Sequence, residues 1–344
     1  NYIHLLRKAL IKAGFAQVPV ASLNFSGLER DSGFRLSLPL LRKFLAAVYY
    51  GDEMMCLANQ LRPYENERGT VNALCAKWQS EIAAQFYQKR GVSFADMQRN
   101  FVAIADSFAA IPITKTPKVK VGIVGEIYVK YSPLGNNHLE RFLQSEDCEV
   151  NLPGLLGFLQ YCIFNSRKDI KLYGGSAIKK RFLQAALAFT VKREGAMLAA
   201  IRRHKGLHAP AVFPVMSKMA DGVIGHGAKM GEGWLLTAEM MELVSSGFEN
   251  IVCAQPFGCL PNHICGKGMV SKIRAIYPKA NITPIDYDPS ATEVNQENRI
   301  KLMLAVARER LDASNGGGSA PHLSTPAFSA ESPAPLAVPA LSYM

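Results

Sequence analysis

The chain has 344 residues, of which 49% are hydrophobic and 19% charged, and its formal net charge is +11. This is the composition of a globular chain with a sizeable core, and the length suggests about two domains. No apolar run reaches the roughly 18 residues that a membrane span needs, and no export signal is visible, so we expect a cytoplasmic protein. Its seven unevenly spaced cysteines favour reduced thiols or metal ligands over a disulfide framework.

The first third of the chain is expected to be mostly helical. Gly14 follows a helical pattern as a left-handed cap, Pro63 ends a long helix, and Ser93 resembles the start of a capping box. Helices are expected over residues 2–13, 40–61 and 70–90 and after residue 93, with a short strand at 18–23. The chain starts within a helix and without Met, which suggests a fragment. We therefore interpret residues 1–112 as the helix-rich end of a truncated α/β domain.

A Pro/Thr connector at residues 112–117 marks the expected domain boundary. Strands are expected at 119–124, 149–152, 251–254 and 281–285, and helices at 138–143, within 153–205, at 234–245, after 268 and at 292–311. Because strands alternate with helices, residues 118–311 should form a Rossmann- or flavodoxin-like domain. The predicted fold class is α/β and two-lobed, with a doubly wound, mainly parallel sheet. Residues 312–344, rich in Gly, Ser, Ala and Pro, should be flexible.

The positive charge is compatible with nucleic-acid binding, but the basic residues are spread over many helices. They include Arg7 and Lys8, Arg42 and Lys43, Lys179 to Arg181, and Arg202 and Arg203. No zinc-finger spacing, RNA-recognition signature or basic zipper accompanies them. Solvated helix faces are the favoured interpretation, and a basic nucleic-acid binder stays as an alternative.

The most informative stretch is residues 250–269, a short apolar strand followed by a loop with three cysteines. Ligands of open α/β sheets bind beyond the carboxyl ends of the strands, so this loop is a candidate site. Cys259, in a Gly-Cys-Leu-Pro turn, is the main candidate metal ligand, whereas Cys253 lies in the strand as a core thiol and Cys265 should begin a helix. Cys253, Cys259, His263 and Cys265 are four candidate ligands that could hold zinc or part of an iron–sulfur cluster, although the spacing matches no standard zinc motif. The zinc alternative uses Cys259, His263 and Cys265. The remaining cysteines are interpreted as core residues (Cys56, Cys75 and Cys162) or left unassigned (Cys148).

Two other stretches carry candidate pocket residues. The segment 122–126 follows a strand and suggests close approach of a cofactor to the backbone, but it lacks the full dinucleotide fingerprint. Glu126 is either a site carboxylate or a helix cap. His226 and Glu232 lie in a glycine-rich segment that is either a functional loop or a connector. A metal-free module that binds a nucleotide or CoA is therefore a further alternative.

Several longer motifs together resemble one family. They are Val121-Gly-Ile-Val-Gly-Glu-Ile-Tyr-Val129, Gly231-Glu-Gly-Trp-Leu-Leu-Thr237, Gln255-Pro-Phe-Gly-Cys-Leu-Pro-Asn-His263 with Gly266-Lys-Gly268, Ile285-Asp-Tyr-Asp-Pro289 and Val294-Asn-Gln-Glu-Asn-Arg-Ile-Lys301, together with Arg62-Pro-Tyr-Glu65. Over about residues 1–308 the chain resembles the acyl-CoA dehydratase activase-related proteins, also called CoA-substrate-specific enzyme activases.

That family joins an ATPase region of the sugar-kinase/actin type to a region similar to 2-hydroxyacyl-CoA dehydratase subunits and double-cubane cluster proteins. The resemblance implies a 4Fe-4S cluster and ATP-driven, low-potential electron transfer to a CoA-ester dehydratase or similar acceptor. The family's Pro-Phe-Gly-Cys cysteine falls on Cys259, and Lys267 would stabilise the charge of a reduced cluster if it lies close enough. The other cluster ligands and the ATP site are expected upstream of this fragment.

The expected assembly is a homodimer without membrane or nucleic-acid partners. Besides Cys259, the candidate pocket residues are Glu126, His226, Glu232, His263 and Lys267. No catalytic residue is predicted, and whether the chain is itself an enzyme stays open.

Overall fold

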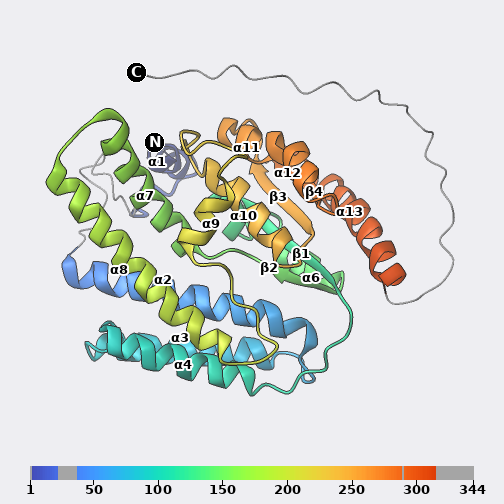
Figure 1. Ribbon diagram of the computed structural model, residues 1–344, viewed down its shortest axis with the longest axis horizontal. Helices are drawn as coiled ribbons and strands as arrows, with labels where there is room; N and C mark the ends of the chain where they lie inside the picture. Colours follow the sequence, from blue (N-terminus) through green and yellow to red (C-terminus); the bar gives the residue numbers. More distant parts are fainter. Residues whose placement is uncertain (1, 22–36, 289, 315–344) are drawn as a thin grey trace.

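The structure, a computed structural model, describes residues 2–21, 37–288 and 290–314 (Figure 1). At the centre of this part lies a four-stranded, all-parallel β-sheet, which confirms the α/β class and the parallel sheet expected from the sequence. The strands are β1 Val119–Gly125, β2 Cys148–Asn151, β3 Asn250–Pro256 and β4 Asn281–Tyr287. The α-helices are α1 Tyr2–Lys12, α2 Leu38–Leu61, α3 Thr70–Tyr87, α4 Phe94–Ala109, α5 Ile127–Tyr131, α6 Leu139–Ser145, α7 Leu155–Tyr173, α8 Ala177–Arg202, α9 Phe213–Met219, α10 Trp234–Ser245, α11 Leu260–Cys265, α12 Val270–Ile276 and α13 Glu293–Ser314.

The strand order is β2-β1-β3-β4, so the direction in which the chain crosses the sheet reverses between β1 and β3. At the end of β1, Gly125 pairs with Ala254 of β3. Gly125 has φ +153°, and a Cβ built on it would lie 1.8 Å from the Ala254 carbonyl oxygen. Glycine is therefore required at this point. Ligands of open parallel sheets bind beyond such a reversal, which marks the carboxyl edge of β1 and β3 as the place to search for a site.

Apolar side chains cover both faces of the sheet, as expected for parallel strands that form continuous hydrophobic runs. Ile123 lies on the face where Leu143 of α6 and Leu304 of α13 pack. Val124, the next residue, lies on the opposite face in the cluster that includes Leu243 of α10.

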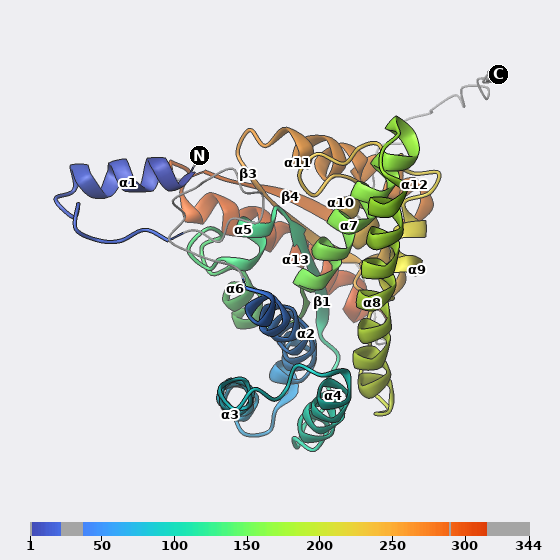
Figure 2. The same cartoon turned by 90° about the vertical axis from the view of Figure 1, so that its left-hand side faces the viewer.

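A layer of helices packs beside the sheet. Its core joins side chains of α2, α3 and α4 to Leu156 of α7 and Leu198 of α8. Figure 2 shows α2, α3 and α4 gathered below the sheet, with α8 running along the edge of the molecule. Helix starts follow the sequence signals, since Ser37 caps α2 and Ser93 accepts the backbone N–H of Asp96 at the start of α4.

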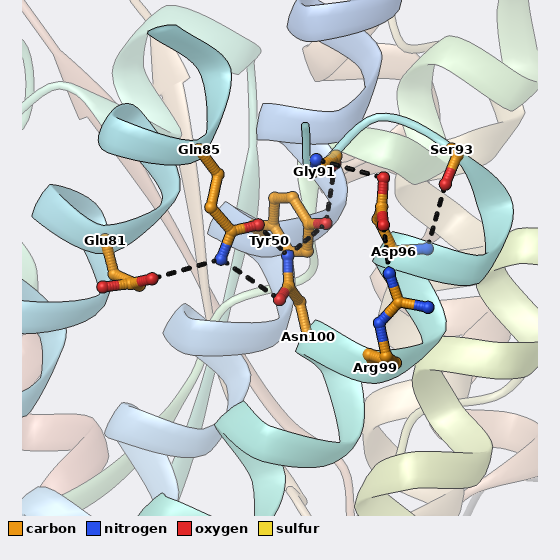
Figure 3. A network of polar contacts seen from close by, with 8 residues as sticks. All are labelled: Tyr50, Glu81, Gln85, Gly91, Ser93, Asp96, Arg99 and Asn100. Carbon is orange, nitrogen blue, oxygen red and sulfur yellow. Dashed lines mark hydrogen bonds and ion pairs between the residues drawn. The ribbon is translucent and has the colours of Figure 1, made fainter. Parts of the chain in front are cut away.

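A buried polar network joins these helices (Figure 3). The amide nitrogen of Asn100 donates to the hydroxyl of Tyr50 at 2.9 Å and to Oε1 of Gln85 at 2.8 Å. The Tyr50 hydroxyl donates to the carbonyl of Gly91 at 2.8 Å, and burial raises the Tyr50 pKa well above its usual value. These hydrogen bonds therefore connect helices α2, α3 and α4.

A cavity of about 80 Å³ lies between the helical layer and the sheet, lined in part by four carboxylates. Asp52 accepts the backbone N–H groups of Leu155 and Leu156 at 2.9 and 2.8 Å and so caps α7 from a distant helix. Glu194 accepts the N–H of Phe213 at 3.0 Å, Glu242 accepts that of Ala211 at 3.0 Å, and Glu239 pairs with Lys130.

Most predicted elements are confirmed within a few residues, but short helices were missed. The loop expected after β1 contains α5, and α9 and α11 were not anticipated. The strand predicted at 18–23 is wrong where it can be seen, since residues 18–21 are not in a strand and 22–23 lie outside the described residues. Helix α13 extends to Ser314, and the rest of the predicted flexible tail also lies outside them. Within the described ranges, no helix combines the length and the apolar character needed to cross a membrane.

Candidate functional site at the carboxyl edge of the sheet

Cys259 stands just beyond β3 and immediately before α11. Its backbone N–H donates to Pro256 at 3.1 Å, and its carbonyl accepts the N–H of His263 at 3.0 Å, which closes the first turn of α11. The preceding Phe257 is exposed, and Gly258 adopts φ +73° to make the turn. The thiol is half-buried and belongs to none of the hydrophobic clusters of the described residues. Cys259 is thus a partly exposed residue at the sheet edge and is not part of the described hydrophobic core.

Asn262 holds this sulfur. Its side chain is fully buried, and its amide nitrogen lies 3.2 Å from Sγ of Cys259 and 3.3 Å from Oε2 of Glu232. Asn262 follows Cys259 by three positions, so the two side chains share one face of the turn. An N–H group beside sulfur interacts more strongly with a thiolate than with a thiol, because the negative charge strengthens the hydrogen bond. The Oδ1 atom of Asn262 is buried and has no hydrogen-bond partner in the described part of the chain.

Glu232 joins the two loops that meet at the strand-order reversal. Its Oε2 accepts from Asn262, while its Oε1 accepts the backbone N–H of Ile127 at 3.1 Å, at the start of α5. The glycine-rich segment before α10 makes this position possible, since a Cβ on Gly233 would lie 2.2 Å from the Ala228 carbonyl oxygen. The predicted pocket residue Glu232 therefore lies beside Cys259, as a buried structural carboxylate.

Glu126 caps the helix that follows β1. Its Oε2 accepts the N–H of Val129 at 2.9 Å, and its own backbone N–H donates to Ala254 at 3.1 Å. The structure thus supplies the capping role left open for Glu126 by the sequence, at the same edge of the sheet as Cys259.

His263 belongs to a second polar group at this edge. Gln255 donates through Nε2 to Nδ1 of His263 at 3.1 Å and to Oδ1 of Asp286 at 2.6 Å. Because Nδ1 accepts, the neutral ring carries its proton on Nε2, which lies 3.8 Å from Oδ1 of Asp286. Oε1 of Gln255 is buried and accepts no hydrogen bond from any residue that the structure describes. Hydrogen bonds of Gln255 therefore connect β3 to both α11 and β4 at this edge.

Sequence reasoning missed Gln255, Asn262 and Asp286 as site residues. All three lie inside motifs that carried the family resemblance, and Gln255 and Asp286 come from the carboxyl ends of adjacent parallel strands. A search of strand ends for polar side chains would have found that pair.

The structure does not join His226 or Lys267 to this group. His226 lies 3.1 Å from the Ser217 carbonyl through Nε2, and its ring packs edge-on against Trp234 with 4.6 Å between centroids. Lys267 is exposed in the turn after α11 and forms no ion pair with the described residues. These distances therefore place His226 against Ser217 and Trp234, and Lys267 is exposed.

The donor atoms do not assemble into a metal site. Across the described ranges, no three His, Cys, Asp or Glu side chains come together in a group that could hold a metal ion. The zinc set predicted from Cys259, His263 and Cys265 fails because Cys265 ends α11, about 240° around the helix axis from Cys259 and about 9 Å along it. The expectation that Cys265 begins a helix was therefore wrong. A 4Fe-4S cluster is commonly held by four thiolates, and Cys259 alone does not supply them.

The other cysteines divide by burial. Cys253 is fully buried in β3, as predicted, and burial raises its thiol pKa to about 12. Burial also raises the thiol pKa of Cys265, and that of Cys56 to about 12. Cys162 is exposed on α7, so its interpretation as a core residue was wrong. Cys148, left unassigned, is buried at the start of β2.

The fold and this edge define a parallel α/β protein whose candidate site is a half-buried thiol held by a buried asparagine at the strand-order reversal. Comparisons of the chain with protein-family models, with curated proteins and with solved structures find no match.

Proposed function

We propose that this chain is part of an iron–sulfur electron-transfer protein of the CoA-substrate-specific enzyme activase kind. In this proposal Cys259 is one thiolate ligand of a 4Fe-4S cluster, and the other thiolates and the ATP site lie outside these residues. Electrons would pass at low potential to a 2-hydroxyacyl-CoA dehydratase or similar acceptor. The observation that carries the proposal is the position of the Cys259 sulfur, half-buried at the strand-order reversal with the Asn262 amide 3.2 Å away.

The chemistry of this edge suits a thiolate ligand. Thiolates are the usual ligands of iron–sulfur clusters, and hydrogen bonds to sulfur are among the features that set cluster potentials. Asn262 provides such a donor from a fully buried position, and Glu232 fixes its orientation. We further infer that the sheet is doubly wound, that the helical layer forms a second lobe and that the protein acts as a homodimer in the cytoplasm.

The test is anaerobic reconstitution of the chain extended at its N-terminus, with ferrous iron and sulfide. The expected product is brown, with the broad visible absorbance of thiolate-ligated iron. Cys259→Ser should lose most of this absorbance, whereas Cys162→Ser, which removes an exposed thiol on α7, should keep it. Equal spectra for the two variants would contradict the assignment of Cys259 as a ligand of the cluster.

A metal-free module that binds a nucleotide or CoA is the second candidate. It is favoured by two fully buried amide oxygens at this edge, on Gln255 and Asn262, that have no hydrogen-bond partner among the described residues. A ligand that binds the folded chain and not the unfolded chain would stabilise the fold by RT ln(1 + [L]/Kd). Thermal unfolding with ATP or CoA, together with metal analysis, separates the two: ligand-dependent stabilisation of a metal-free chain supports this candidate, and iron content without stabilisation contradicts it.

A further inference from the structure

The hairpin of α7 and α8 carries most of the chain's excess positive charge. Residues 167–193, which we call the basic hairpin, contain eight Lys or Arg residues and one acidic residue, Asp169, in a chain of net charge +11. In Figure 1 the hairpin extends away from the sheet to the margin of the molecule, where α7 turns into α8. A large part of the net positive charge is thus concentrated in this one hairpin.

Most of these charges form no ion pair with the residues that the structure describes. Asp169 is bound to Lys229, outside the hairpin. Arg167 donates to the neutral Gln184 at 3.1 Å. Four basic side chains at the hairpin tip have no ion pair within the described ranges: Lys171, Lys179, Lys180 and Arg181. The tip is therefore a positively charged surface without internal compensation.

An apolar stripe lies on the outward face of α8, between these charges. Its members are separated by four, three and four residues, the spacing of one helix face: Ile178, Phe182, Ala185 and Phe189. Ile178 is 82% exposed, Phe182 70% and Phe189 46%. The opposite face of α8 is buried through residues such as Glu194 and Leu198. The stripe, about 16 Å long, has no covering element in the described part of the chain.

Charged groups lie beside this stripe near both of its ends. Arg181 and Lys192 lie on one side of it by helical position, and Arg193 lies on the other, with its guanidinium 3.4 Å from the centroid of the Phe189 ring. A partner must therefore offer apolar side chains at its centre and negative charge at its rim.

The apolar stripe and the basic side chains beside it together indicate which kind of partner can bind this surface. A second copy carries the same hairpin and the same net charge, so like charges oppose self-association through this face. Nucleic-acid phosphates would neutralise the rim but leave the stripe exposed to water. A flat anionic membrane would meet the tip, where Leu172 and Tyr173 are exposed, but not Phe189 along the side of α8. A helix lying along α8 covers the stripe and reaches both rims.

We propose that the apolar stripe of α8 and its basic rim form a docking surface for an acidic amphipathic helix of a partner protein. The partner helix presents apolar residues at helical spacing to Ile178, Phe182 and Phe189, and carboxylates to Arg181 and Lys192. Charge steers the approach, and the stripe provides the buried contact. This surface is independent of Cys259 and of the function proposed for it.

The test uses the full chain and a labelled synthetic helix with Leu at this spacing and Glu on both flanks, titrated by fluorescence anisotropy. A peptide of identical composition in scrambled order is the control for charge alone. The ordered peptide should bind at least about tenfold more tightly than the scrambled one, and added salt should weaken its binding. Equal binding of the two peptides would overturn the proposal.

Two variants localise the contact. Ile178→Ser with Phe182→Ser should weaken peptide binding by about tenfold or more, because both anchors are lost. Leu302→Ser, at a 71% exposed position on α13, should not change it.

Two further measurements test the alternative partners: binding to vesicles of phosphatidylserine and phosphatidylcholine, and sedimentation of the chain alone. Stripe-dependent vesicle binding without peptide binding, or stripe-dependent dimerisation, would overturn the proposal in favour of a membrane or a second copy.

Discussion

Glu232 and Asn262 form a buried hydrogen bond of 3.3 Å that connects the segment before α10 to α11, the helix that follows β3. The other carboxylate oxygen of Glu232 accepts the N–H of Ile127 after β1, and the amide of Asn262 reaches Cys259 after β3. The position of the candidate sulfur is therefore set by polar contacts across the strand-order reversal, and not by hydrophobic packing.

Asn262→Leu should slow alkylation of Cys259 by iodoacetamide at neutral pH by several-fold to about tenfold, because the variant lacks the N–H group that stabilises a thiolate. The rate is measured by mass spectrometry of the peptide that contains Cys259. Cys162, exposed on α7, is the internal control and should react at an unchanged rate. An unaltered Cys259 rate, or equal slowing at both cysteines, would contradict the stabilisation of the thiolate by Asn262.

Gly125→Ala should lower the free energy of unfolding by about 3 kcal/mol or more, because the new Cβ would meet the Ala254 carbonyl oxygen in a backbone conformation that side chains rarely adopt. Gly51→Ala is the matched control. A Cβ there meets nothing within 4 Å, and the residue lies inside α2, so the change should stabilise by about 0.5–1 kcal/mol. Urea unfolding measures both. Similar effects of the two changes would show that β1 and β3 do not approach each other closely at Gly125.

The buried carboxylates predict a stability that falls as pH rises. Burial raises the pKa of Asp52 to about 6 and that of Glu194 to about 7. Both groups bind a proton more tightly in the folded state, so their favourable contribution is complete below the unfolded pKa values. It is lost as pH rises through about 6 and about 7. Each contribution is on the order of 2–3 kcal/mol.

Melting temperatures across this pH range test the assignment. Glu194→Gln keeps a carbonyl acceptor for the N–H of Phe213 but cannot titrate, so it should reduce the decline. Glu67→Gln, at an exposed position on the loop before α3, should leave the decline unchanged. Identical pH profiles for wild type and Glu194→Gln would show that titration of Glu194 does not cause the decline.

Much of the fold follows from local sequence. The helix Trp234–Ser245 was predicted with the bounds it has, because Gly233 and Gly247 punctuate a clear apolar pattern. The short helices α9 and α11 were missed because each has only one strong signal, a proline in its first turn at Pro214 or Pro261.

The site was harder to predict because its contacts join distant residues. Glu232 and Asn262 are thirty positions apart, and no local pattern reveals which side chain meets the other. Cys162 was misassigned because α7 buries the neighbouring Tyr161 and leaves the next position outside. His226 shares the glycine-rich segment with Glu232, but its ring packs on Trp234 away from the thiol.

The most direct test of the central claim is the iron and acid-labile sulfide content of the N-terminally extended protein, purified without oxygen. The account predicts that wild type and Cys162→Ser contain equal amounts, consistent with a 4Fe-4S cluster, and that Cys259→Ser retains little of either. A Cys259→Ser protein with the full wild-type iron and sulfide content would contradict the assignment of this thiol.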